Sequence, residues 1–213
     1  MNCRLQPHTA AELERGINNM EPIFSLPYSE FCVAQQLARL LPSRKGYSLY
    51  APLSRQQQGV DLMLARRRGR RVRVACIQVK SSRTYSRPTA TPRTKRPFRY
   101  DTWFNNFDCP PEADFFCLVA LYPAVDAAQK RELGTWWAPQ VLLFSQLEMR
   151  RFLRRVRTVQ GERDRMFGFG FDRPDQAFQT RGDAARSFLD FSKHLLPRRL
   201  GMLRGFLSAQ LMV

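Results

Sequence analysis

The segment Arg71–Ser81 constrains the fold more than any other part of the chain, because it predicts a strand that is apolar on both faces. Val74 and Cys76 lie at alternate positions on one face of this strand. Ile77 and Val79 lie on the other face. A strand with two apolar faces needs cover on both sides, so we expect it in the centre of a sheet. With 213 residues, the chain is long enough to bury such a core.

The surrounding segments predict an α/β sandwich around one mixed sheet. Apolar residues at helical spacing predict a helix over about 28–41, which Pro42 ends. Ser145 and Glu148 form a capping box that starts another helix, extending to about Arg157. Short apolar runs predict further strands over residues 47–51, 60–65, 98–104, 114–122, 135–144 and 166–171.

The sequence also predicts a division of the chain into three parts. These are an N-terminal extension (1–24), a core (25–160) and a mainly helical C-terminal extension (161–213). A capping box over 9–12 predicts a short helix in the first part. Residues 82–99 are basic and rich in proline, which predicts a loop within the core. In the last part we expect a helix over 172–196, ended by Pro197.

The charge of the chain indicates a polyanionic partner. Lys and Arg total 35 against 18 Asp and Glu, which gives a net charge of +17. Such a surplus repels itself in a compact fold, so nucleic acid is the first expected partner and an anionic membrane surface the second. Between Leu62 and Tyr100 there are thirteen Lys and Arg residues and no acidic residue. The residues expected to contact nucleic acid are Arg66, Arg67, Arg68, Arg83, Arg87, Arg93, Lys95 and Arg96.

Composition argues against several classes of protein. No apolar run reaches the roughly 18 residues of a membrane-spanning helix, and we expect no signal peptide. The five cysteines are widely spaced without a CxxC pair, so we expect no disulfide framework and a cytoplasmic location. The chain has only two histidines, which disfavours a Cys/His zinc site, and both are expected to be structural.

Three residues near the ends of two adjacent strands form a candidate catalytic site. Asp61 starts the second strand, while Gln78 and Lys80 lie two apart on the third and share one face. In a hairpin the start of one strand meets the end of the next, so these side chains come together. Carboxylate and amide oxygens suit Mg²⁺, and a nearby lysine can stabilise developing negative charge. Glu30 adds a carboxylate on the helix face expected to meet the sheet, where it needs a metal, a lysine or water.

The pattern Glu30 … Gly59-Val-Asp61 … Gln78-Val-Lys80 resembles the PD-(D/E)XK nuclease superfamily and its restriction-endonuclease-like fold. The helix glutamate and the GxD strand are similar to those of archaeal Holliday-junction resolvases, and the QxK form is similar to Mrr-type restriction enzymes. Small bacterial members related to homing endonucleases of this fold are also similar. The resemblance covers about residues 25–150 and implies an αβββαβ core, with a central mixed sheet flanked by helices.

The resemblance implies a Mg²⁺-dependent DNA endonuclease, with Mn²⁺ as another usable ion. In this role Asp61 is the principal metal ligand and Gln78 the second, where most members have Glu or Asp. Lys80 is then the catalytic lysine, and Glu30 an accessory ligand or base. The sequence leaves the choice between DNA and RNA open. Many enzymes of this fold cut as dimers, so a homodimer is one option.

Each of these residues also has an ordinary explanation. Asp61 could cap a strand or pair with an arginine, and Gln78 and Lys80 could form a polar strand end. Glu30 could be stabilised by the helix macrodipole. The neutral Gln78 favours a second interpretation, a catalytically inactive nucleic-acid-binding protein of the same fold. A third interpretation assigns the apolar segment after Pro197 to binding a protein or a membrane surface.

Overall fold

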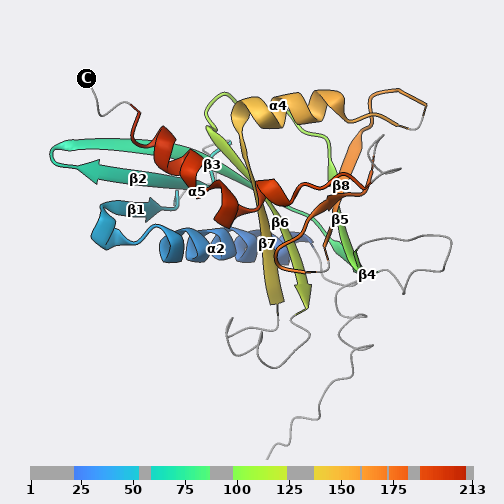
Figure 1. Ribbon diagram of the computed structural model, residues 1–213, viewed down its shortest axis with the longest axis horizontal. Coiled ribbons are helices and arrows are strands. Elements are labelled where there is room, and N and C mark those ends of the chain that lie inside the picture. The colour runs from blue at the N-terminus through green and yellow to red at the C-terminus, as the bar shows by residue number, and fades with distance from the viewer. Residues whose placement is uncertain are drawn as a thin grey trace, which may run out of the picture.

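The computed structural model describes residues 22–52, 59–86, 98–123, 137–158, 160–171, 173–181 and 188–209. These residues form a mixed α/β fold with two sheets, where the sequence predicts one (Figure 1). The five-stranded sheet has the order β1 (Tyr47–Tyr50), β2 (Leu62–Arg68), β3 (Arg71–Ser81), β6 (Phe115–Pro123) and β7 (Trp137–Ser145). The four-stranded sheet has the order β4 (Thr84–Ser86), β5 (Tyr100–Asn105), β8 (Met166–Phe171) and β9 (Phe178–Gln179). The helices are α2 (Pro22–Leu40), α4 (Gln146–Arg155) and α5 (Leu196–Phe206), with the 3-10 helices η1 (Ser43–Lys45) and η3 (Ser192–His194).

Strand β3 occupies the centre of the five-stranded sheet, and its bounds match the prediction. It pairs antiparallel with β2 and parallel with β6, so the predicted mixed sheet and α/β class are confirmed. Strand β7, which contains Pro139, lies at one edge of this sheet. An edge position suits proline because it has no N–H to donate to a neighbouring strand. The capping box at Ser145 and Glu148 is also confirmed at the start of α4.

The first half of β3 differs from the prediction because it is not covered on both faces. Pairing with β6 begins only at Ile77, and the residues nearest the turn extend with β2 as a two-stranded ribbon. In Figure 1 this ribbon projects beyond the rest of the sheet. Val72 is 52% exposed and Val74 is 41% exposed, although their alternation predicts a buried face.

Two hydrophobic cores cover the two faces of the five-stranded sheet. On one face α2 and α5 contribute Val33, Leu37 and Leu203, which pack with Ile77 and Val79. On the other face α4 and the four-stranded sheet pack against β6 and β7 (Figure 1). We call this the aromatic core; its members include Phe104, Phe116, Phe144, Leu153, Phe167 and Phe169. The residues of β3 that alternate with Ile77 and Val79 therefore face the aromatic core.

Several predictions about the rest of the chain are wrong. The expected loop over 82–99 contains strand β4. The described part of the expected helix over 172–196 contains β9 and η3 instead. Pro197 does not end a helix but lies in the first turn of α5. Proline is favoured there because the first N–H groups of a helix have no partner within it.

The predicted division of the chain at residue 160 does not follow the sheets. Strands β8 and β9 extend the sheet of β5, so the C-terminal part shares one sheet with the core, and its described residues contain β8, β9, η3 and α5. Helix α2 begins inside the expected extension 1–24, and the capping box over 9–12 lies outside the described residues. Where the αβββαβ pattern expects a second helix, the described residues between β3 and β6 contain β4 and β5.

Candidate functional site

Asp61 is fixed against the C-terminal half of β3. The register pairs Leu62 with Ile77, and Asp61 is the residue directly before this first pair. The backbone N–H of Asp61 donates to the carbonyl of Ile77 at 3.0 Å. Its carboxylate Oδ2 accepts a hydrogen bond from the backbone N–H of Val79 at 2.7 Å. The carboxylate therefore lies beside the residue that separates Gln78 from Lys80.

The turn that leads into Asp61 depends on Gly59. Its φ angle is +85°, in the left-handed region that favours glycine. A Cβ at this position would lie 2.7 and 2.8 Å from two side-chain atoms of Pro110. The loop around Pro110 therefore packs directly on the turn, and this contact fixes the backbone from which Asp61 starts.

Gln78 and Lys80 share the face of β3 that meets the aromatic core, as their spacing predicts. Gln78 pairs with Phe116 of β6 and is only 7% exposed. Its Oε1 is buried and has no hydrogen-bond partner among the described residues. Lys80 is half-buried, and its Nζ lies 5.6 Å from the centre of the Phe107 ring. An unpaired buried carbonyl oxygen is costly, so this position calls for a cation or a donor.

The residues at this strand end fit a hard divalent cation. Asp61 supplies a carboxylate, and Gln78 supplies the unpaired amide oxygen. Among the described residues no group of three or more His, Cys, Asp and Glu side chains is placed to hold a metal ion. Mg²⁺ tolerates such a sparse set, because it binds through one or two carboxylates and keeps several waters.

Asp114 makes the same kind of contact with the backbone of β3 as Asp61 does. Its Oδ2 accepts a hydrogen bond from the N–H of Cys76 at 2.8 Å, just as Asp61 does from Val79. Holding an amide of β3 is therefore a structural role that an aspartate has in this fold. What distinguishes Asp61 is its contact with Val79, the residue between Gln78 with its unpaired amide oxygen and Lys80.

Glu30 lies on the side of the sheet opposite to Gln78 and Lys80. It is half-buried on α2, and α2 packs on the face formed by Ile77 and Val79. Gln78 and Lys80 point to the opposite face. That Glu30 shares a metal with them therefore stays a prediction, for which the arrangement of the described residues gives no support.

The predicted nucleic-acid contacts are divided between the two ends of the β2–β3 hairpin. Arg67 and Arg68 are exposed near the turn, roughly 20 Å along the strand from Asp61. Arg66 is half-buried, donates to Ser208 Oγ and lies over the ring of Tyr47. Arg83 is exposed just beyond Lys80. The other four, Arg87, Arg93, Lys95 and Arg96, lie outside the described residues.

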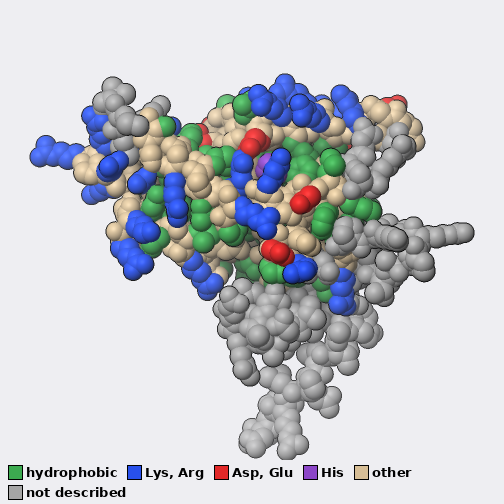
Figure 2. All heavy atoms as spheres, viewed as in Figure 1, with side chains coloured by type: hydrophobic (Ala, Val, Ile, Leu, Met, Phe, Trp, Pro, Cys, Tyr) green, Lys and Arg blue, Asp and Glu red, His purple; other side chains and the backbone are tan. Residues whose placement is uncertain are grey.

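Helix α4 carries a second exposed basic surface. Its arginines Arg150, Arg151, Arg154 and Arg155 are all exposed. In Figure 2 basic side chains gather along α4 at the top and around the hairpin at the left. Arg150 donates to the carbonyl of Cys109 at 3.3 Å, and Gln146 donates to that of Pro110. The loop that packs on Gly59 therefore also connects α4 to the neighbourhood of Asp61.

Comparisons with known proteins add no assignment to this geometry. No family model matches the chain, and neither the curated proteins nor the solved structures contain a match. None of the helices in the described residues is long and apolar enough to span a membrane.

Proposed function

We propose that this protein is a Mg²⁺-dependent nuclease that hydrolyses phosphodiester bonds in DNA. The observation that carries the proposal is the strand end where the Asp61 carboxylate holds the N–H of Val79, between Gln78 with its buried, unpaired carbonyl and Lys80. A carboxylate, a neutral oxygen donor and an ammonium group at one site are the groups that metal-assisted hydrolysis uses.

Each of the three residues has a distinct role in this proposal. Asp61 and Gln78 hold the cation, which neutralises phosphate charge and lowers the pKa of a bound water when it is present. Lys80 is close enough to the surface to reach a phosphate, because it is only half-buried. Its ammonium group stabilises the negative charge that develops on the phosphate oxygens. Mn²⁺ suits the same oxygen donors.

The fold supports the proposed restriction-endonuclease-like relationship in its first half. Helix α2 precedes three antiparallel strands, and β6 then joins parallel to β3, which agrees with an αβββ beginning. The connection between β3 and β6 contributes β4 and β5 to a second sheet. We infer that this second sheet takes the place of the helix in the αβββαβ core.

The two exposed basic surfaces supply contacts for the DNA backbone. The hairpin turn lies too far from Asp61 to touch the same phosphate, so its arginines bind a neighbouring part of the backbone. A separation of roughly 20 Å is shorter than one turn of duplex DNA, about 34 Å. A single duplex can therefore contact the turn and the candidate site together.

A catalytically inactive nucleic-acid-binding protein is the second candidate. It is favoured by the neutral Gln78 in place of a second carboxylate and by the position of Glu30 on the other face of the sheet. The basic surfaces serve this function equally well. The two candidates differ in one respect, which is whether DNA is cut when a divalent ion is added.

Replacing Lys80 with alanine should lower the rate of DNA cleavage about a hundredfold, because the charge that stabilises the transition state is removed. Plasmid, single-stranded and branched DNA are incubated with the full chain in Mg²⁺, in Mn²⁺ and in a chelator. Lys45→Ala is the matched control, since Lys45 is an exposed lysine on η1. Salt-sensitive binding without cleavage by the wild type would favour the inactive binding protein.

Replacing Gln78 with glutamate should increase the stabilisation by Mg²⁺. A second carboxylate attracts the cation, and a tenfold gain in affinity raises the Mg²⁺-dependent shift in Tm by about 4 °C. Thermal unfolding with and without Mg²⁺ measures this directly, without any activity. Gln160→Glu is the control, because Gln160 is an exposed glutamine outside the helices and strands. Equal Mg²⁺ shifts in both variants would place the metal elsewhere.

A further inference from the structure

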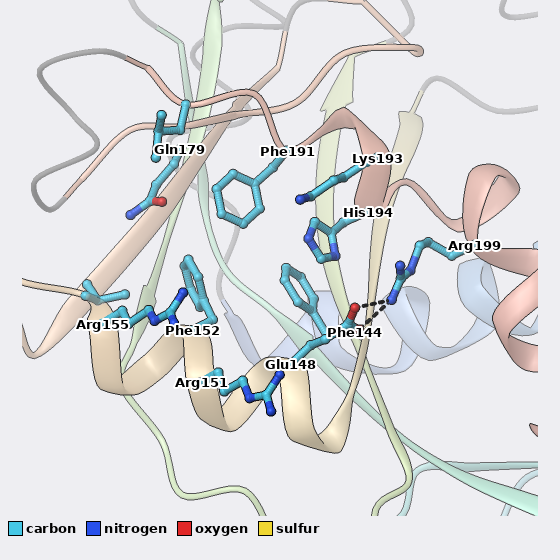
Figure 3. A pocket seen from close by; sticks show the side chains of 12 residues that line it. Phe144, Glu148, Arg151, Phe152, Arg155, Gln179, Phe191, Lys193, His194 and Arg199 are labelled. Carbon is cyan, nitrogen blue, oxygen red and sulfur yellow. Dashed lines mark hydrogen bonds and ion pairs between the residues drawn. The ribbon is translucent and has the colours of Figure 1, made fainter.

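A cavity of about 450 Å³ opens between α4 and η3, on the aromatic-core side of β7 (Figure 3). We call it the α4–η3 cavity. Phe152 from α4, together with Phe191 and His194, contributes aromatic surface to it. Arg151, Arg155 and Lys193 also line it, and all three are exposed. A volume of this size lies in the range of small-molecule sites.

The charge of the cavity favours an anion. Four cationic side chains line it, namely Arg151, Arg155, Lys193 and Arg199, against one carboxylate, Glu148. That carboxylate is already neutralised, because it pairs with Arg199 and accepts hydrogen bonds from Ser145 at the start of α4. Arg151, Arg155 and Lys193 remain to bind a ligand, and their positions at the surface suit a phosphate.

The inner part of the cavity favours a flat ring with a hydrogen-bond donor. The ring of His194 stacks on Phe144 with centroids 4.3 Å apart, and Phe152 meets Phe191 edge to face at 5.5 Å. His194 is only 7% exposed, and its Nδ1 has no partner among the described residues. Burial, reinforced by Arg199, lowers the pKa of His194, which favours the neutral ring. In a neutral imidazole an unprotonated Nδ1 can accept a hydrogen bond.

We propose that the α4–η3 cavity binds a nucleotide, with the base against the aromatic side chains and the phosphate among Arg151, Arg155 and Lys193. A nucleobase has the flat face that stacks on aromatic rings and the N–H groups that Nδ1 of His194 needs. A fatty-acid anion has the charge but no donor for this nitrogen. The nucleotide is either free or part of a single strand, since both present the same base and phosphate.

The cavity shares no residue with Asp61, Gln78 or Lys80, so this proposal does not rest on cleavage. Titration calorimetry of the full chain with dAMP, dTMP, inorganic phosphate, dodecanoate and a short single-stranded DNA tests it. We expect a nucleoside monophosphate to bind at least about ten times more tightly than inorganic phosphate. Binding of the oligonucleotide alone, with the same dependence on Arg155, identifies a single strand as the source.

Arg155→Ala should weaken nucleotide binding about tenfold, because it removes a charge-assisted hydrogen bond to the phosphate. Arg154→Ala is the matched control on α4, since Arg154 is also exposed but does not line the cavity. Lys80→Ala should leave this affinity unchanged, which separates the two sites. The proposal fails if no nucleotide or oligonucleotide binds, if phosphate or dodecanoate binds as tightly, or if Arg154→Ala weakens binding as much as Arg155→Ala.

Discussion

Replacing Asp61 with asparagine should lower DNA cleavage about a thousandfold while leaving the fold and the affinity for DNA close to those of the wild type. The substitution removes the charged ligand from the candidate metal site. Asparagine keeps an oxygen in the same place, so it can still accept the hydrogen bond from the N–H of Val79. The expected loss therefore reports on the metal and not on the backbone of β3.

Asp114→Asn provides the control for this experiment. Asp114 holds the N–H of Cys76 in the way that Asp61 holds that of Val79, and both are half-buried. We expect this variant to cleave at the wild-type rate. Cleavage rates with Mg²⁺ and binding isotherms without it are measured for both variants. Equal losses in the two would show that Asp61 acts only through the backbone, and full activity of Asp61→Asn would exclude this site.

The arrangement of Asp61, Gln78 and Lys80 could be predicted because every step in it is local. The spacing of Gln78 and Lys80 fixes their common face on a strand. The turn at Gly69 and Arg70 is short, so the hairpin register follows from its length and brings Asp61 to the end of β3 that carries Gln78 and Lys80. The side of the sheet on which α2 packs is not local information, and the position of Glu30 depends on it.

The exposure of side chains along β3 also depends on contacts that are not local in the sequence. Val74 and Ile77 have the same character in the sequence, but only Ile77 is covered, because β6 begins to pair there. Where β6 begins depends on a connection of more than thirty residues, and alternation within β3 carries no information about it. Pro197 illustrates an ambiguity of another kind. Proline both follows the end of one helix and occupies the first turn of the next, so the residue alone does not tell which helix it marks.

The aromatic core could not be assembled from the sequence because its members come from distant segments. Phe144 on β7 contacts Phe152 on α4, Phe169 on β8 and Phe191 just before η3. Each segment alone predicts only a buried phenylalanine. Phe144, Phe152 and Phe191 together line the α4–η3 cavity beside His194. The spacing of the two histidines in the sequence does not indicate this arrangement.

Replacing Phe144 with alanine should lower the free energy of unfolding by about 3–5 kcal/mol, the usual cost of removing a buried phenylalanine. Phe144 is 1% exposed, lines the α4–η3 cavity and stacks on the ring of His194. Chemical denaturation at neutral pH measures the change, and Leu147→Ala is the control. Leu147 is 53% exposed, so its removal should change the free energy of unfolding by no more than about 0.5 kcal/mol.

A smaller effect of Phe144→Ala would mean that neighbouring side chains move into the space that the ring leaves. The nucleotide affinity of the same variant provides a second measurement, because the ring of Phe144 stacks on that of His194. It separates a core that stays rigid from one that collapses. If the core stays rigid around the new space, Phe144→Ala should enlarge the cavity and weaken nucleotide binding together with stability. If the core collapses instead, stability should recover while the affinity still falls, because His194 loses the ring that holds it in place. Unchanged affinity in the variant would show that the position of His194 does not depend on Phe144.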